Sequence, residues 1–151
     1  MRIVVDDLSG PRIAAFLADH VRQMREITPP ESKHALDMDG LRAPDVTFWS
    51  VLDGDEVIGC GALKRLSADH AELKSMRTSP ARTRGGVASA LLAHILDEAA
   101  RRSYRRLSLE TGSAPFFLPA RRLYTKFGFT PCAPFADYRP DPSSTFMTRE
   151  L

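Results

Sequence analysis

The sequence predicts one α/β domain built on a mixed β-sheet. Its 151 residues are the length of one ordinary domain. Two strand-like runs, 46–52 and 56–66, are rich in aromatic and β-branched residues and are close enough to form an antiparallel hairpin. Further on, an amphipathic helix over 87–102 lies between the strand-like runs 71–78 and 106–110. That order is typical of a right-handed βαβ unit, whose two strands are parallel, so the sheet should contain both kinds of pairing.

The elements before the hairpin follow from local signals. Residues 2–5 form a short apolar strand candidate, and residues 10–25 have apolar side chains at spacings of three and four, which predicts a helix with one buried face. The pair Pro29 and Pro30 ends that helix, because proline cannot continue it. Residues 30–41 predict a short, irregular helical segment. The turn into the second strand of the hairpin is at 53–55, where Asp, Gly and Asp follow one another.

The last third of the chain completes the sheet. A helix is predicted over 119–127 and ends at Gly128, the residue type that favours the left-handed conformation after a helix. Strands are predicted around Thr130 and over 145–150. With no repeat or linker, residues 1–151 should form a single domain, with six to seven strands flanked by about four helices.

Composition and charge exclude several classes of protein. The formal net charge of +2 is too balanced for a dedicated nucleic-acid binder. The chain has no apolar run long enough to cross a bilayer and begins without a signal peptide, so we expect a cytoplasmic protein that does not act at membranes. The two cysteines, Cys60 and Cys132, have neither metal-site nor disulfide-framework spacing, and we expect packing residues and no metal.

A loop of small and basic residues, 79–86, joins the third long strand to the clearest helix. It ends in Gly85 and Gly86, which lets an anion approach the free N–H groups and the positive dipole end of the helix. Arg82 and Arg84 suit a ligand with several phosphates. The loop lacks the Gly-Lys-Ser/Thr ending of a P-loop and the G-x-G-x-x-G of a dinucleotide site. The alternative is a plain glycine turn with solvated arginines.

The residues of this loop resemble the acetyl-CoA signature of the GNAT N-acetyltransferases. In that signature Gln or Arg is followed by two variable residues, Gly, one variable residue, and Gly or Ala. Gly86 and Ala88 match its small positions, whereas Thr83 stands where the signature has Gln or Arg. Residues 120–129 are similar to a second landmark of the family, A-x-x-L-Y-x-x-x-G-F. Segments 29–37 and 108–113 look like a small bacterial single-domain branch of unknown substrate.

The resemblance implies a GNAT-like fold in which acetyl-CoA, the co-substrate, lies in the splay between two parallel strands. Main-chain groups before the glycine loop would contact its pantetheine arm, and a backbone N–H near Met76 would polarise the thioester carbonyl. The loop and the start of its helix would hold the pyrophosphate. These cofactor-binding residues are Met76, Arg77, Thr78, Arg84, Gly85, Gly86, Val87, Ala88 and Ser89.

Three residues are candidates for proton transfer. By resemblance Tyr124 would give a proton to the departing thiolate of CoA, and a phenol near its reference pKa of about 10 suits that role. The alternative is that Tyr124 is only an aromatic packing residue of the core. Glu72 and Glu110 could each take the proton of the acceptor amine. Their alternatives are a surface pair of Glu72 with Lys74 and a capping role for Glu110. Strict strand alternation would place Glu72, Lys74 and Met76 on one face and Leu73 on the other.

The acceptor site is expected to be built from the 30–41 segment and the hairpin. His34, Asp37 and Trp49 are its substrate-binding candidates, since Asp37 could pair with a cation and His34 titrates near neutral pH. Phe48, Asp137 and Tyr138 are weaker candidates. Capping or surface roles are the alternative for these polar residues.

These inferences together predict an acetyl-CoA-dependent N-acetyltransferase that acts on a primary amine of a small molecule. Direct attack by the amine would be helped by a general acid and a general base. The alternative is a catalytically silent module with the same fold that binds acyl-CoA or a protein partner. Exposed edge strands are compatible with a homodimer. The sequence identifies neither the acceptor amine nor the oligomeric state.

Overall fold

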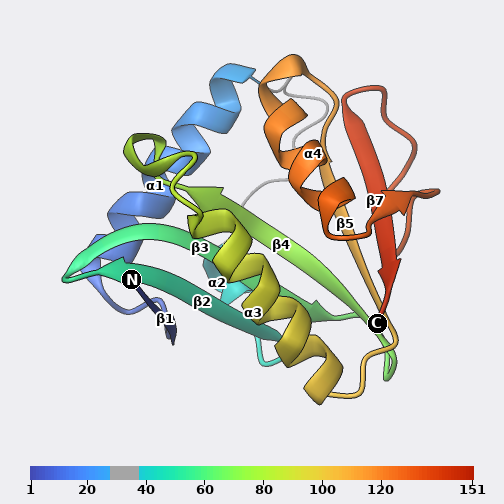
Figure 1. Ribbon diagram of the computed structural model, residues 1–151, viewed down its shortest axis with the longest axis horizontal. Coiled ribbons are helices and arrows are strands. Elements are labelled where there is room, and N and C mark those ends of the chain that lie inside the picture. The colour runs from blue at the N-terminus through green and yellow to red at the C-terminus, as the bar shows by residue number, and fades with distance from the viewer. Residues whose placement is uncertain (28–37) are drawn as a thin grey trace.

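The computed structural model describes residues 1–27 and 38–151, and its centre is a seven-stranded mixed sheet in the order β1-β2-β3-β4-β5-β7-β6 (Figure 1). The strands are β1 (Arg2–Val5), β2 (Val46–Asp53), β3 (Glu56–Arg65), β4 (His70–Thr78), β5 (Arg106–Gly112), β6 (Thr130–Pro131) and β7 (Ser144–Glu150). The helices are α1 (Pro11–Ile27), α2 (Met38–Leu41), α3 (Val87–Arg101) and α4 (Leu118–Lys126), with single 3₁₀ turns η2 (Pro80–Arg82) and η3 (Pro115–Phe117).

This architecture confirms the predicted fold class. The hairpin β2–β3 and the βαβ unit β4–α3–β5 both form, and the boundaries of the described elements differ from the predicted ones by only one or two residues. The remaining strand pairs are antiparallel. Of the irregular segment predicted over 30–41, the described part is the short helix α2.

The two faces of the sheet carry different helices. Helices α3 and α4 cover the face toward the viewer in Figure 1, and α1 and α2 lie behind the sheet. On the α3 face the core includes Trp49, Leu73, Ile95 and Leu109. On the α1 face a smaller core is formed by the buried residues Leu8, Ile13, Leu17, Leu41, Phe48, Cys60 and Ala62. We call these two sides of the sheet the α3 face and the α1 face.

The two parallel strands at the centre of the sheet separate halfway along. β4 and β5 pair over four residues, from His70 opposite Arg106 to Leu73 opposite Leu109. Beyond that point β4 continues to Thr78 along β3, and β5 continues to Gly112 along β7. The sheet therefore opens between the carboxyl ends of β4 and β5, on the side where the chain enters the glycine loop.

A β-bulge in β4 changes which side chains face which helices. Two residues of β4, Ser75 and Met76, lie opposite the single residue Gly61 of β3, and Ser75 has a left-handed φ of 56°. Met76 consequently packs on the α3 face, together with Leu73. The prediction that Met76 shares a face with Glu72 and Lys74 was wrong, because an extra residue reverses the alternation of every residue after it.

The two cysteines differ in burial. Cys60 is fully buried on the α1 face, and burial raises the pKa of its thiol to about 12, so it remains an uncharged packing residue. Cys132 is a partly buried free thiol. Among the described helices, none has both the length and the apolar character required to cross a membrane.

Candidate active site

The glycine loop leads directly into the amino terminus of α3. Gly86 immediately precedes the helix in the left-handed conformation, with φ 82° and ψ 4°, and its carbonyl accepts the first helical hydrogen bond, from the N–H of Ala90. The N–H groups of the three preceding residues, Val87–Ser89, therefore lack partners within the helix. A Cβ built on Gly86 would have no atom within 4 Å, so the space beside this residue is open.

The two arginines of the loop have different surroundings. Arg82 is ion-paired with Asp53 at 2.8 Å and with Glu56 at 3.2 Å, so the end of the β2–β3 hairpin neutralises its charge. Arg84 is exposed, has a left-handed φ of 67°, and makes no ion pair with any described residue. Arg84 is thus the cation of the loop that remains available to a phosphate.

Tyr124 is held on the α3 face by the turn that ends α4. Gly128 adopts φ 91°, and this left-handed residue turns the chain so that the N–H of Phe129 donates to the carbonyl of Tyr124 at 3.0 Å. The ring of Phe129 then packs edge-on against the Tyr124 ring, with 5.8 Å between centroids. The G-F pair of the second landmark therefore fixes the phenol in place.

The pKa of Tyr124 is higher than the sequence suggested. The side chain is buried, and burial, with a smaller contribution from the charge of Glu110, raises the pKa of the phenol above its ordinary value of 10. Its hydroxyl makes no hydrogen bond to a described residue. Tyr124 therefore stays protonated at physiological pH and has a proton to donate.

Glu72 lies on the other face of the sheet and is only 3% exposed. Its cross-strand neighbours Lys64 and Ser108 share that face, and the hydroxyl of Tyr138 donates a hydrogen bond of 2.6 Å to its Oε2. Glu72 makes no ion pair with Lys74, so the surface pair considered as its alternative role is absent among the described residues. The same hydrogen bond, together with burial, raises the pKa of Tyr138.

Glu110 follows Ser108 on β5 and faces the same side as Glu72, just past the point where the strands separate. The hydroxyl of Ser144 donates to its Oε2 at 2.7 Å. Tyr138 precedes β7 and Ser144 begins it, so both carboxylates accept hydroxyl hydrogen bonds from the same end of the chain. The role of Ser144 was missed, because its partner is 34 residues away and only the β5–β7 register brings them together.

The structure brings some predicted site residues together and leaves others apart. Met76, Arg77 and Thr78 line the end of β4 where the sheet opens. Trp49 does not join the carboxylates: it is 2% exposed on the α3 face, where its ring packs against His94 at 5.8 Å. His34 and Asp37 lie outside the described residues.

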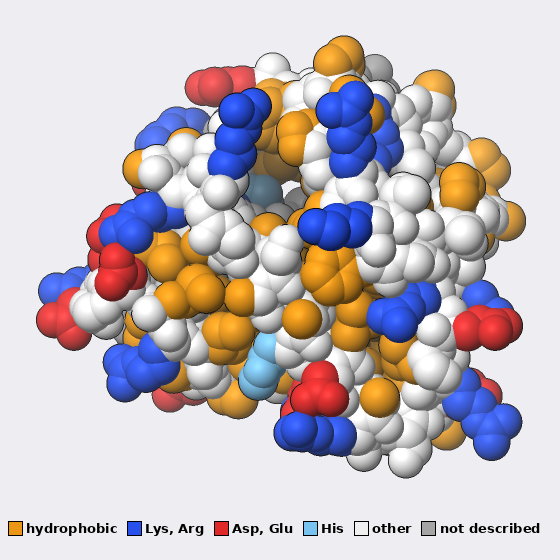
Figure 2. Space-filling model, in the orientation of Figure 1, with side chains coloured by type: hydrophobic (Ala, Val, Ile, Leu, Met, Phe, Trp, Pro, Cys, Tyr) orange, Lys and Arg blue, Asp and Glu red, His pale blue; other side chains and the backbone are white. Residues whose placement is uncertain are grey.

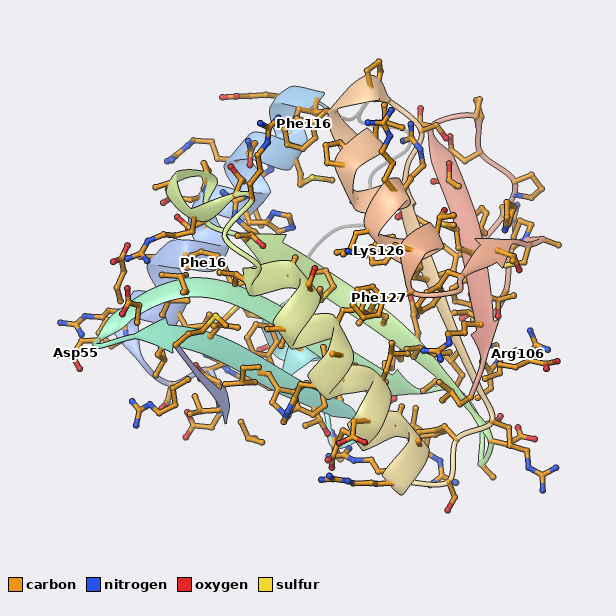
Figure 3. All side chains as sticks on the ribbon, in the orientation of Figure 1. Phe16, Asp55, Arg106, Phe116, Lys126 and Phe127 are labelled. Atoms are coloured by element: carbon orange, nitrogen blue, oxygen red, sulfur yellow. The ribbon has the colours of Figure 1, made fainter. Side chains whose placement is uncertain are left out.

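The surface of the molecule is hollowed on the face that carries α3 and α4 (Figure 1, Figure 2). Figure 2 shows a hollow in the upper half of this face, with Lys and Arg side chains around its rim. Figure 3 places Lys126 of α4 beside this opening and Phe127 between α3 and α4. Among residues 1–27 and 38–151, no cluster of three metal-ligating side chains occurs. The described residues thus provide a glycine loop with free N–H groups, a protonated phenol on the α3 face and two carboxylates on the α1 face.

Known proteins resemble this chain in both sequence and fold. The model of the acetyltransferase (GNAT) family matches residues 13–129. The chain is 54% identical over 151 residues to the uncharacterised N-acetyltransferase YsnE of Bacillus subtilis, covering 100% of each chain. A putative acyl-CoA N-acyltransferase from Klebsiella pneumoniae has a TM-score of 0.77 and 26% identity, covering 99% of this chain and 97% of the other.

A structure with the co-substrate in place has the same architecture. It is a GNAT family acetyltransferase from Elizabethkingia anophelis with acetyl-CoA bound, with a TM-score of 0.67 and 16% identity, covering 99% of this chain and 97% of the other. The family match spans most of the chain, from α1 through α4 to Phe129. The protein is therefore an acyltransferase that belongs to the acetyltransferase (GNAT) family.

Proposed function

We propose that the protein transfers the acetyl group of acetyl-CoA to a primary amine of a small molecule. The observation that carries this proposal is the separation of β4 from β5 beyond Leu73 and Leu109. The phenol of Tyr124 is on the α3 face, whereas Glu72, in the paired part of β4, and Glu110, just beyond the pairing on β5, point to the α1 face. A thioester placed where the strands separate would have a proton donor and a proton acceptor on opposite sides.

The glycine loop fits the diphosphate of acetyl-CoA. Three N–H groups at the start of α3 lack helical partners, the space in front of Gly86 is open, and the positive end of the helix dipole favours an anion. Arg84 and, at the rim of the opening, Lys126 would add positive charge. The pantetheine arm would then run along the end of β4, past Thr78, Arg77 and Met76.

The proposed chemistry assigns one proton transfer to each face. Glu72 or Glu110 would take the proton of the acceptor amine, directly or through water, as the amine attacks the thioester carbonyl. A backbone N–H near Met76 would stabilise the oxyanion that develops on the carbonyl oxygen. Tyr124 would give its proton to the departing thiolate, so the new amide bond forms as the thioester bond breaks.

A thermal-melt titration with acetyl-CoA tests the co-substrate site, with ATP and NAD as polyphosphate controls. Ligand at 100 times its Kd should stabilise the fold by about 2.7 kcal/mol, which raises the Tm of a domain of this size by roughly 5–10 °C. We expect this shift with acetyl-CoA alone. Equal shifts with all three ligands would show that the glycine loop binds polyphosphates in general and is not specific for acetyl-CoA.

A panel of primary amines then separates an enzyme from a silent binding module. Transfer to at least one amine, measured as release of free CoA thiol, supports the proposed reaction. A shift in Tm without turnover on any amine would instead support a module that binds acetyl-CoA and does not use it.

A further inference from the structure

The described residues provide hydrogen-bond partners for only one nitrogen of the Arg77 guanidinium. Its Nη1 donates to Nδ1 of His20 at 3.1 Å and to the side-chain oxygen of Gln23, both on α1, and the group lies over the ring of Phe16. Its Nε is buried and has no hydrogen-bond partner in the described part of the chain. Its Nη2 also makes no hydrogen bond to a described residue, and no described carboxylate forms an ion pair with Arg77.

The unsatisfied atoms form the edge with which arginine binds carboxylates. Nε and Nη2 point the same way in the planar guanidinium and can donate two parallel hydrogen bonds to one carboxylate. A buried donor without a partner is costly, and native proteins usually supply such a group with a ligand, an ion or ordered water. Burial also lowers the pKa of the guanidinium, and the charge of Asp19 on α1 offsets only part of this effect.

The bulge in β4 places Arg77 on the face that carries the proposed bases. Arg77 lies opposite Cys60, a residue of the α1-face core, and Glu72 and Glu110 point to that same face. Arg77 also directly follows Met76, the residue near which the thioester carbonyl would be held. The α1 face of this part of the sheet therefore carries two carboxylates and a cation that has no ion-pair partner among the described residues.

His20 of α1, which accepts a hydrogen bond from Arg77, provides a hydrogen-bond donor but no positive charge. Burial, and next the charge of Arg77, lower the pKa of His20 to about 4, so His20 is neutral at physiological pH. Because its Nδ1 accepts the hydrogen bond from Arg77, its proton is on Nε2. The only other cation of β4 on this face is Lys74, opposite Ala62.

We propose that the acceptor is an amine that also carries a carboxylate, as an amino acid does, and that the Nε–Nη2 edge of Arg77 binds this carboxylate. The proposal rests on the proposed function and narrows its substrate class. The negative end of the acceptor would pair with Arg77, and the amine would be oriented toward the thioester and the carboxylate that takes its proton. An acceptor without the carboxylate would leave Nε and Nη2 of Arg77 without an acceptor.

Matched pairs of acceptors test this proposal. Each pair is an amino acid and the amine formed by removing its carboxylate: lysine and cadaverine, histidine and histamine, tryptophan and tryptamine, and serine and ethanolamine. Transfer from acetyl-CoA is measured as kcat/KM on the wild type and on Arg77→Gln and Arg77→Lys. We expect the wild type to prefer the carboxylated member by about 10- to 100-fold, the value of a hydrogen-bonded charge pair. Arg77→Gln should remove that preference by raising the KM of the amino acid, and Arg77→Lys should restore part of it.

Two control variants separate binding from a structural role. Gln23→Ala removes a partner of Nη1 and leaves the Nε–Nη2 edge in place, so it should keep the preference. Lys74→Gln removes the other cation of this face and should also keep it. Melting curves of every variant, with and without acetyl-CoA, show whether the fold and the co-substrate site are intact.

Three results would overturn the proposal. They are no preference for the carboxylated acceptors, an equal loss for both members of a pair in Arg77→Gln, and a loss of preference in Gln23→Ala or Lys74→Gln that matches the loss in Arg77→Gln. Failure of the proposed function looks different, because acetyl-CoA would still raise the Tm while no member of any pair is acetylated. That result would overturn both proposals.

Discussion

At the scale of single residues, the proposed chemistry depends on a phenol that the protein keeps protonated. Tyr124 is buried against Phe129, and its pKa is raised. A hydroxyl in this state does not titrate in the physiological range. It can still donate to a thiolate, whose charge develops only in the transition state. The pH dependence of turnover should therefore reflect the carboxylate base and the acceptor amine.

Tyr124→Phe tests this role directly. The substitution removes the hydroxyl and keeps the ring that packs on Phe129, so we expect kcat to fall by about 100-fold while the Kd of acetyl-CoA is nearly unchanged. Tyr104→Phe is the matched control, since Tyr104 is a partly buried member of the same core cluster. Steady-state kinetics and calorimetric titration measure the two quantities. Unchanged turnover in Tyr124→Phe would make the phenol a packing residue.

His20 predicts how the stability of the fold depends on pH. Its pKa is about 4 in the folded protein and near 6.5 in the unfolded chain, so between these values the unfolded chain binds more protons. The contribution of His20 to the free energy of unfolding should be fully present above pH 6.5. It should fall by roughly 3 kcal/mol as the pH is lowered toward 4.

Urea titrations at pH 7.0, 5.5 and 4.5 measure that slope. His20→Gln removes the titrating group, so the free energy of unfolding of the variant should decline less steeply than that of the wild type. Part of the slope should remain, because the pKa of His70 is also lowered by burial. Identical slopes in the two proteins would show that His20 does not titrate as its surroundings indicate.

At the scale of elements, the glycine loop and α3 form one unit, and Gly86 is where they join. A residue with a side chain is strained at φ 82°, at a cost of about 1–2 kcal/mol, although nothing would contact its Cβ. Gly86→Ala should therefore lower the free energy of unfolding by about that amount and keep most of the affinity for acetyl-CoA. Gly86→Glu carries the same strain and also places a negative charge where the diphosphate would lie.

We therefore expect Gly86→Glu to weaken acetyl-CoA binding at least tenfold relative to Gly86→Ala, which corresponds to about 1.4 kcal/mol. Calorimetric titration of both variants measures the difference, and their melting curves give the shared strain. Equal affinities in the two variants would contradict the assignment of the phosphates to this loop.

The sequence was most informative about elements and least informative about distant contacts. Periodicity and turn residues predicted the described strands and helices, and the glycine loop was recognisable because its residues are consecutive. The bulge at Ser75 carries no such signal, so regular alternation misplaced Met76. The ion pairs of Arg82 and the hydrogen bond of Glu72 with Tyr138 join segments 26 to 66 residues apart, and only the folded sheet brings them together.

At the scale of the whole molecule, the sheet consists of two antiparallel parts joined by the short parallel contact of β4 with β5. One part contains β1 to β4 and the other contains β5 to β7. Within each part, neighbouring strands pair in antiparallel fashion. The proposed site lies where the two parts separate. A ligand in the opening would touch both parts.

This arrangement has a consequence for folding. The hairpin β2–β3 forms from residues close in sequence, whereas the four pairs of β4 with β5 join residues 36 positions apart (70 to 106), so their loop-closure entropy is larger. We expect the β2–β3 amides to become protected from hydrogen exchange early in refolding and the β4–β5 amides late. Pulse-labelling during refolding would test this order, and simultaneous protection would contradict it. On this view, the opening between β4 and β5 is the last feature of the protein to form.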